Sequence, residues 1–572
     1  MISPPRLSFR GLLRISWIRA LLSSVTFFVV FLVLMHPGYA INDDLNMIAL
    51  VDGYPGGHPV PFLVFSNVLL GFLLKPLYAL PTALNWQVLL FVLVQFVAVW
   101  ALLCLVFDGP ASRTYRAYGV LAVLLCDAYF IQNLTFTTTA SFACIAGSCL
   151  ILFAARSAAP FARASLWCGV ALIVLGSLIR LEMSLVALSL ALPAAIVAQA
   201  VFNRRAMLVA FVMASSIILA GFAVDRLYVR SSAEWHAYDV YNGTRSMLQD
   251  THRMENLGRT IRRVGWSAND QELFARWFFP DQDVYSLEKL QYLVKRVSPY
   301  SVNPGYTLST MLYTPFARFL VPYALIMLCN FLMAYAHGVF RRASTPLLAI
   351  AAIVLADNAY FALAWKIADR MLLSSLSSAA IVGFLIPYWM APEGRRDSRA
   401  RSARAIAIAA GLVMAVALSL TLVYAAEISQ SNARQQVLYT QLVADLDRLQ
   451  RDGAISKSAL IVSPAHGLPL EWSNPFTLAW PRIPYLDTGW MTFSPRYREI
   501  LGQFDAAPLT DALYKKDNIY LMTRINIIPY IARYYVEHER RTVEFRQIYE
   551  MPNPYHVPGY DGVYLYKVVR GH

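Results

Sequence analysis

The sequence predicts a polytopic α-helical membrane protein with about eleven transmembrane helices, one further re-entrant or interfacial helix, and a small α/β domain at the C-terminal end. Three observations predict this fold class. Of the 572 residues, 58% are apolar and only 15% are charged, and the mean hydropathy is +0.48. Long apolar stretches recur as far as residue 425, whereas residues 427–572 have a soluble composition. A soluble enzyme with a single anchor would not have so apolar a chain.

The apolar stretches are long enough to cross a bilayer, with one exception. Residues 60–79 contain Pro61, Lys75 and Pro76, an unusual set for a helix that faces lipid. We therefore expect this stretch to be re-entrant or to lie in the membrane interface. The expected spans are near residues 20–36, 87–107, 117–132, 139–155, 166–180, 183–200, 207–228, 314–337, 346–363, 371–390 and 405–425.

Arginines gather in the short connections between alternate spans, and this bias predicts their cytoplasmic side. It accounts for the net charge of +14 without a nucleic-acid partner. We expect a multi-pass protein of the plasma (inner) membrane with a cytoplasmic N-terminus and an outer C-terminal domain. The first apolar stretch could also be a signal peptide cut near 38–40, but the many later spans favour a retained anchor. The basic connections contain Arg113, Arg116, Arg156, Arg163, Arg204, Arg205, Arg341, Arg342 and the arginines of 395–404.

The polar regions divide the chain into five parts. These are a cytoplasmic N-terminus at 1–19, a first membrane part at 20–228 with an acidic outer loop at 37–59, an outer soluble loop at 229–313, a second membrane part at 314–426, and an outer α/β domain at 427–572. In the last part we expect helices at 433–451 and 527–537 and strands at 458–462, 518–523, 542–549 and 562–569. It contains no GxGxxG, Walker, GxSxG or HExxH motif, so we expect it to dock on or cover an outer site.

The acidic outer loop is the first candidate for chemistry. It places Asp43, Asp44 and Asp52 within ten residues of one another. Adjacent carboxylates raise each other's proton affinity, which suits a proton acceptor or a divalent-cation site. The alternative is an acidic surface loop that keeps its neighbouring helices from inserting too far.

The expected topology brings the turns at 132–139, 180–182 and 366–370 to the same side as this loop. Arg180, Lys366 and Arg370 would then face the carboxylates and suit a phosphate-bearing lipid. Alternatively, Arg180 pairs locally with Glu182, and the residues of 366–370 form an interfacial pair.

The outer soluble loop offers a second set of candidates. Trp266, Asn269 and Asp270, with Arg245, could recognise a polar acceptor or a sugar, because indoles stack on sugar faces and amides and carboxylates bind hydroxyls. The alternative is a capped turn packed on the membrane, in which Ser267 or Asn269 is the N-cap of a helix over 271–278.

The basic N-terminus, the first span, the Asn42-Asp43-Asp44 loop, the proline-rich helix and the later spans ending in an outer domain resemble the GT-C superfamily over roughly residues 15–425. These are membrane glycosyltransferases that take a sugar from a polyprenyl-phosphate carrier. The resemblance implies that Asp43 or Asp44 acts near the acceptor, as a base or through a metal, and that Arg180, Lys366 and Arg370 hold the donor phosphate. The acceptor would be an envelope glycan, lipid or protein. Two other functions fit the same composition: a transporter or flippase of a lipid-linked saccharide, and a non-catalytic envelope assembly protein.

Overall fold

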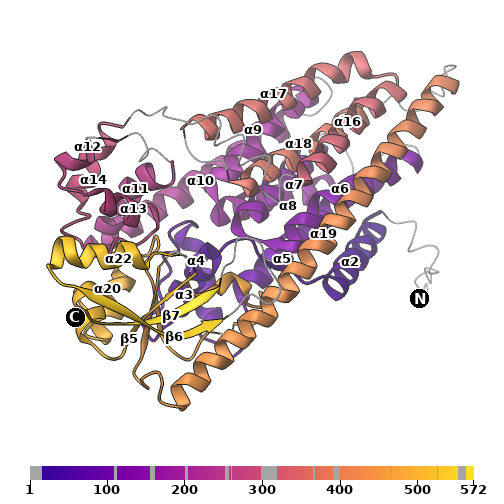
Figure 1. The fold of residues 1–572 in the computed structure, drawn as a ribbon. Helices are drawn as coiled ribbons and strands as arrows, with labels where there is room; N and C mark the ends of the chain where they lie inside the picture. The colour runs from indigo at the N-terminus through magenta and orange to yellow at the C-terminus, as the bar shows by residue number, and fades with distance from the viewer. Residues whose placement is uncertain are drawn as a thin grey trace, which may run out of the picture.

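The structure, a computed structural model, is a bundle of long helices with a smaller mixed domain at one end (Figure 1). We call this end, where the bundle meets the C-terminal domain, the domain end. The structure describes residues 16–108, 113–154, 161–199, 204–251, 257–258, 260–297, 318–364, 368–390, 400–464, 467–478, 480–524, 526–551 and 562–571.

Within the described residues, a helix lies at each of the eleven predicted spans. Eight of these helices are long and apolar enough to cross a membrane, which confirms a multi-pass membrane protein in outline. In the other three, the apolar stretch whose side chains the structure describes is shorter, at Arg163–Ile179, Leu181–Val197 and Leu320–Ala336, so the count of eleven crossings stays a prediction. The eight are α2 (Ser16–Leu34), α5 (Trp86–Asp108), α6 (Arg113–Gln132), α7 (Phe136–Ala154), α10 (Arg204–Ser231), α17 (Phe340–Ala364), α18 (Asp369–Met390) and α19 (Ala400–Arg451), and the three are α8 (Phe161–Ile179), α9 (Leu181–Gln199) and α16 (Leu320–Ala336).

Helix α7 is the centre of the bundle, and nearly all of its side chains are buried. It packs most closely on α8, where small residues let the two backbones approach. A Cβ atom added to Gly147 would lie 2.5 Å from the carbonyl oxygen of Gly169, and one added to Gly169 would lie 2.7 Å from that of Gly147. Small residues have this role in many membrane helix pairs.

The proline-containing stretch forms a helix over only part of its length, and its re-entrant or interfacial placement stays a prediction. Helix α4 (Val68–Tyr78) has 11 residues, and Asn67 caps it by accepting a hydrogen bond from the amide of Leu69 at 3.0 Å. A helix of this length is about 16 Å long, roughly half the thickness of the hydrocarbon core. The acidic loop folds just before it into another short helix, α3 (Asp43–Asp52).

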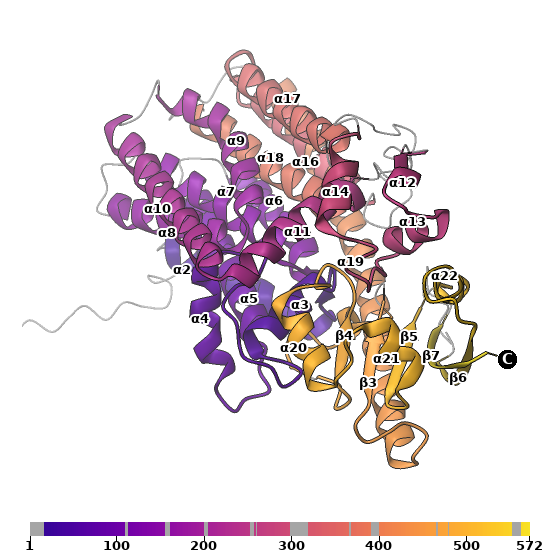
Figure 2. The same ribbon diagram turned by 90° about the vertical axis from the view of Figure 1, so that its left-hand side faces the viewer.

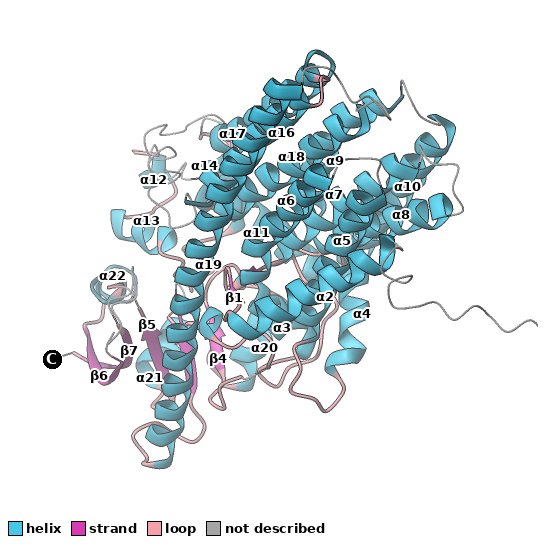
Figure 3. Ribbon diagram, turned by 90° about the vertical axis from the view of Figure 1, so that its right-hand side faces the viewer, coloured by secondary structure: helices cyan, strands magenta, loops and turns pink. Residues whose placement is uncertain are grey.

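The C-terminal domain contains a mixed five-stranded sheet in the order β4-β3-β5-β7-β6. Strands β3 (Leu460–Ser463), β4 (Tyr485–Asp487) and β5 (Ile519–Thr523) are parallel, and β6 (Val543–Met551) and β7 (Val563–Arg570) complete the sheet by antiparallel pairing (Figure 3). The four predicted strands are confirmed, whereas β4 is too short to stand out in the sequence. The domain also holds α20 (Pro495–Gln503), α21 (Leu509–Lys515), α22 (Ile528–Tyr534) and a π-helical turn at Tyr535–Glu539.

The two faces of this sheet pack on different parts of the chain, because alternate residues of a strand point to opposite faces. Leu460 and Val462 of β3 join a core with α11 (Ala233–Gln249), α13 (Ala268–Ala275) and α14 (Leu287–Val294), and the same segment also forms the short α12 (Thr260–Arg263). Ile461, between them, packs in a core with Leu442 of α19. The 229–297 segment and the C-terminal domain therefore share one core (Figure 2).

Helix α19 is continuous over 52 residues and extends past the bundle along the C-terminal domain (Figure 1). The span predicted at 405–425 and the helix predicted at 433–451 are thus one element, about 78 Å long. The expected boundary at residue 426 lies inside this helix. Continuous helix joins the membrane part to the domain without a flexible linker.

Candidate functional site

The turns that were predicted to share one side do meet at the domain end. Strand β1 (Gly38–Tyr39) pairs in parallel with β2 (Asn133–Leu134), which joins the start of the acidic loop to the turn between α6 and α7. The break between α8 and α9 and the start of α18 complete the same region through the contacts described below. We call Asp43, Asp44, Arg180 and Arg370 the carboxylate cluster.

Asp43 and Asp44 are the first two residues of α3, and they differ sharply in exposure. Successive helix residues point about 100° apart, so one carboxylate can face out while the other faces in. The Asp43 side chain is 22% exposed, whereas Asp44 is only 1% exposed. The pair therefore presents one accessible carboxylate backed by a buried one.

The buried carboxylate of Asp44 is held by groups from two other segments. Its Oδ1 accepts hydrogen bonds from the amide of Phe136 at 3.2 Å and from Gln87 Nε2 at 3.4 Å. The buried hydroxyl of Thr135 also favours the charged form of this carboxylate by hydrogen bonding. Burial, and then the negative charge of Asp43, raise the pKa of Asp44 to about 7, against the effect of the Phe136 amide. Asp44 thus changes its charge near neutral pH.

The accessible carboxylate of Asp43 is contacted from two distant elements. Trp490, in the loop after β4, donates a hydrogen bond from Nε1 to Oδ1 at 3.0 Å. Arg370, in the first turn of α18, has its Nη2 3.9 Å from Oδ2. This is a long ion pair between side chains that are 22% and 27% exposed, so the guanidinium is only loosely engaged.

Arg180 is the single residue between α8 and α9, and it makes the predicted local ion pair with Glu182 at 3.1 Å. Its guanidinium also lies over two aromatic rings, at 4.9 Å from the centroid of Phe136 and 5.5 Å from that of Phe65. Phe136 is the residue whose amide binds Asp44, and the Phe65 ring is 4.8 Å from that of Trp490. Aromatic residues therefore connect Arg180 to both carboxylates.

Lys366, the third cation predicted for the donor phosphate, lies outside the described residues. The predicted set is thus represented by Arg180 and Arg370. Both guanidinium side chains are about one quarter exposed, so each keeps some access to solvent.

Helix α3 is bonded to the C-terminal domain along its whole length. Besides the contact of Asp43, Asn46 donates from Nδ2 to Asp487 Oδ2 at 2.7 Å, and Asp52 accepts from Trp480 Nε1 at 2.7 Å. The C-terminal domain therefore covers the acidic loop. This agrees with the expectation that the domain docks on or covers a site formed by other parts of the chain.

The second set of candidates lies in a different place, the core shared by the 229–297 segment and the C-terminal domain. We call Arg245, Trp266, Asn269 and Asp270 the capped-turn cluster. Trp266 donates from Nε1 to the carbonyl of Val284 at 2.7 Å. Asn269 donates from Nδ2 to the carbonyl of Tyr530 at 3.0 Å. Arg245 is 2% exposed and is held by Asn242, by Gln249 and by the ring of Trp277.

Asp270 closes a capping box at the start of α13, in which Ser267 is the N-cap, as one of the two predictions has it. The alternative interpretation of this set, a packed and capped turn, thus describes the observed contacts, although the turn packs on the C-terminal domain. Recognition of a sugar by these four residues stays a prediction, and the hydrogen bonds that they make within the protein do not favour it.

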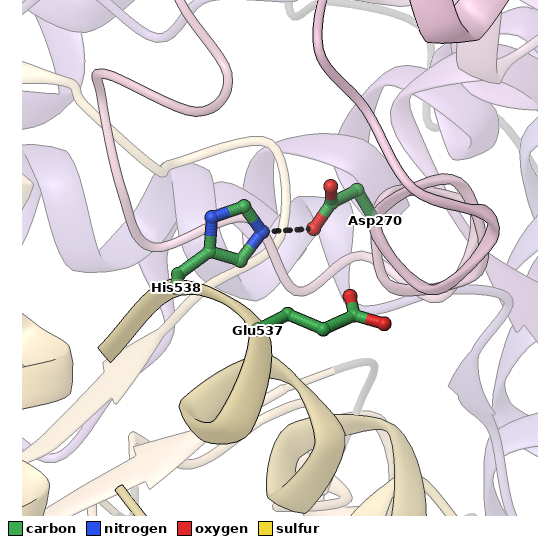
Figure 4. A group of neighbouring side chains, drawn as sticks. All are labelled: Asp270, Glu537 and His538. Carbon is green, nitrogen blue, oxygen red and sulfur yellow. Dashed lines mark hydrogen bonds and ion pairs between the residues drawn. The ribbon is translucent and has the colours of Figure 1, made fainter. Parts of the chain in front are cut away.

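Asp270 also belongs to a group with Glu537 and His538 whose ligand atoms lie within 4.8 Å of one another (Figure 4). His538 Nε2 is 2.8 Å from Asp270 Oδ1. The two oxygens of Glu537 accept hydrogen bonds from Arg533 and Ser267, each at 2.7 Å. These hydrogen bonds join the π-helical turn to α13. A divalent cation at Asp43 and Asp44 stays a prediction.

Sequence reasoning missed the aromatic residues of the site. Trp490 lies 447 positions from Asp43, and Phe65 and Phe136 look like ordinary apolar residues of their segments. Trp490 lies just beyond the carboxyl end of β4, where ligand sites in α/β sheets form, but β4 has only three residues and was not predicted, so no signal in the sequence identifies it.

Comparison with known proteins gives no family for this chain. No protein-family model matches it, and no curated protein matches it. Its function has to be inferred from the two clusters themselves.

Proposed function

We propose that this protein is a membrane glycosyltransferase of the GT-C type, which moves a sugar from a polyprenyl-phosphate carrier to an envelope glycan, lipid or protein. The observation that supports it best is the meeting of Asp43 and Asp44 with Arg370, to which Arg180 is joined through the rings of Phe136 and Phe65. A carboxylate pair beside a loosely held cation, next to apolar helices, suits a substrate with a phosphate head and a lipid tail.

Each part of the cluster has a role in the proposed transfer. The acceptor oxygen forms a bond to the anomeric carbon while the bond from that carbon to the phosphate oxygen breaks. The electron pair of the broken bond stays on the phosphate, where Arg370 and Arg180 stabilise the negative charge. The proton of the acceptor hydroxyl passes to Asp43, the accessible carboxylate, with Asp44 behind it. No cofactor takes part in this scheme, and a divalent cation at the carboxylates is a variant of it.

The proposal includes the finer topology expected from the arginine bias. Eleven helices cross the plasma membrane, α3 and α4 stay at its outer face, the N-terminus is cytoplasmic, and the domain end faces outward. A cysteine-accessibility assay tests this orientation. Cysteines placed at exposed positions near Asp505 should react with an impermeant maleimide in intact cells, and cysteines placed near Arg342 should not.

The decisive experiment compares two aspartates of α3 that make the same kind of contact. Asp43 accepts from Trp490 and Asp52 accepts from Trp480, so Asn at either position keeps an acceptor for the indole. In a transfer assay with polyprenyl-phosphate sugars, we expect Asp43→Asn to lower turnover by about 10²- to 10⁴-fold. We expect Asp52→Asn to stay within a few-fold of the wild type. Full activity of Asp43→Asn and Asp44→Asn would remove the catalytic proposal.

The two rival functions predict different results when the same purified protein and its variants are assayed. A flippase would move a fluorescent lipid-linked saccharide across proteoliposomes without forming a new glycosidic bond. An assembly protein would do neither, and its Asp43→Asn variant would still rescue a deletion strain. Transfer that depends on Asp43 excludes both.

A further inference from the structure

A group of three side chains that can bind a metal ion lies away from the carboxylate cluster, where the π-helical turn meets α13. Asp270 comes from the first turn of α13, and Glu537 and His538 are consecutive residues of the π-helical turn. One ligand atom of each residue lies within 4.8 Å of the other two. Glu537 and His538 extend from their turn toward Asp270 (Figure 4). The proposed transfer reaction uses none of these residues.

The spacing of the three ligand atoms is close to the spacing around a bound metal ion. Nitrogen and oxygen ligands bind a tetrahedral zinc ion at about 2.0–2.2 Å, which places two of them about 3.3 Å from each other. His538 Nε2 and Asp270 Oδ1 are 2.8 Å apart, so a bound ion has to separate them by only about 0.5 Å. Glu537 reaches the same point by rotation about its side-chain bonds, since its side chain is 23% exposed.

The two carboxylates are oriented by further groups of the protein, as the carboxylate ligands of metal sites usually are. The amide of Ser267 donates to Asp270 Oδ2 at 2.8 Å, which leaves Oδ1 directed at His538. Arg533 donates to Glu537 Oε1 at 2.7 Å, and the hydroxyl of Ser267 donates to Oε2 at the same distance. A bound ion replaces the hydrogen bond of His538 and one of those of Glu537, and the other bonds keep the ligands in place.

The group is open to solvent on one side and carries an excess of negative charge. Asp270 is fully buried, whereas the side chains of Glu537 and His538 are 23% and 25% exposed. An ion can therefore enter past these two residues and reach a buried ligand. Asp281 adds a third carboxylate, because it accepts from the hydroxyl of Tyr534 at 2.9 Å and the Tyr534 ring lies 4.6 Å from that of His538. The guanidinium bonded to Glu537 offsets one of the three negative charges.

The donor set identifies the class of ion. Magnesium and calcium ions prefer oxygen ligands, whereas an imidazole nitrogen together with carboxylate oxygens suits zinc and similar transition metals. We propose that Asp270, Glu537 and His538 bind a divalent transition-metal ion of the zinc type, with water completing its coordination. The ion is structural. It joins α13 to the C-terminal domain, across the core that the domain shares with the 229–297 segment.

The test measures metal binding to the full chain in detergent, purified without a histidine tag and stripped of metal with EDTA. Zinc, manganese and magnesium chlorides are titrated in separate calorimetric experiments. We expect zinc to bind at one tight site and magnesium to bind at least about 100-fold more weakly. Saturating zinc should also raise the Tm by about 2 °C or more, because the ion binds the folded chain and the unfolded chain lacks the assembled site.

Two variants each remove one ligand and keep a hydrogen bond of the group. His538→Gln keeps a donor for Asp270, and Glu537→Gln keeps an oxygen that accepts from Arg533. The matched control is His236→Gln, the same change at an exposed histidine of α11. We expect each ligand variant to bind zinc at least about 100-fold more weakly than the wild type and to lose the rise in Tm. The control should match the wild type in both measurements.

X-ray absorption of the zinc-loaded wild type gives an independent readout that needs no variant. It should show a first shell of nitrogen and oxygen at about 2.0–2.1 Å, with the outer scattering of an imidazole. A zinc shell without imidazole would overturn the proposal. The same holds for absence of zinc binding to the wild type, for equal affinities for zinc and magnesium, and for zinc affinities that stay unchanged in both ligand variants.

Discussion

The carboxylate cluster and the capped-turn cluster contain the same kinds of residue, yet they differ in how far their polar atoms are satisfied. In the capped-turn cluster, Asp270 is bonded to Ser267 and His538, and Arg245 is held on three nitrogens. In the carboxylate cluster, Asp43 accepts a hydrogen bond from Trp490 on one oxygen, and the nearest cation among the described residues, Arg370, is 3.9 Å from the other. Spare hydrogen-bonding capacity in an accessible place, more than residue type, distinguishes a candidate site from a structural joint.

The largest expected effect is on activity, in the carboxylate cluster. Replacing Arg370 by Gln removes the charge opposite the departing phosphate, and we expect turnover to fall by about 10²- to 10³-fold with little change in Tm. The measurement is transfer from a polyprenyl-phosphate sugar by the purified variant. The control is Arg226→Gln, which breaks an exposed ion pair with Asp239 and should leave turnover unchanged. Full turnover by the Arg370→Gln variant would contradict the interpretation of the carboxylate cluster as the functional site.

The next effect is on stability, in the capped-turn cluster. Replacing Arg245 by Met removes a buried donor from the side-chain oxygens of Asn242, which is buried, and Gln249, which is half-buried, so we expect a loss of about 3 kcal/mol. The folded fraction should keep its specific activity, since Arg245 does not touch the carboxylates. Thermal unfolding in detergent, followed by circular dichroism, measures the loss. Arg276→Met, at a residue whose side chain is 34% exposed, should cost far less. If Arg245→Met lowered activity but not stability, the capped-turn cluster would be the better candidate site.

The smallest expected effect is a pH dependence of the Tm that comes from Asp44 in the carboxylate cluster. Burial and Asp43 raise the pKa of Asp44 to about 7. The folded protein therefore holds this proton more tightly than the unfolded chain, and the stability gained from it is lost as pH rises from about 4 toward 7. We expect the Tm of the wild type to fall more between pH 5 and pH 8 than the Tm of Asp44→Asn. Parallel Tm curves for the two proteins would show that Asp44 does not titrate in this range.

Local and charge-based features could be predicted from the sequence, whereas long-range contacts could not. The cap at Ser267 depends on residues within three positions, and it is observed. The meeting of Asp43 with Arg370 agrees with the arginine bias of the other connections, which predicts that the turns carrying these two residues share a side.

The hydrogen-bond partners of the candidate residues could not be predicted from the sequence. The hydrogen bond of Asn269 to Tyr530 depends on how the 229–297 segment packs against the C-terminal domain. The spacing of apolar residues in the sequence does not predict that packing. The same holds for Trp490 on Asp43. The continuity of α19 was missed because its apolar and polar halves have different compositions, although the helix persists through both.

The hydrogen bond between Asp43 and Trp490 also has a consequence for synthesis. Its two residues are separated by 447 positions, so at 5–20 residues per second the ribosome needs roughly 20–90 s to deliver the second after the first. During that time the early carboxylates have neither their indole partner nor the cover of the sheet. A nascent chain thus carries the charged groups of the cluster long before it can place them, and the cluster is assembled only late in biogenesis.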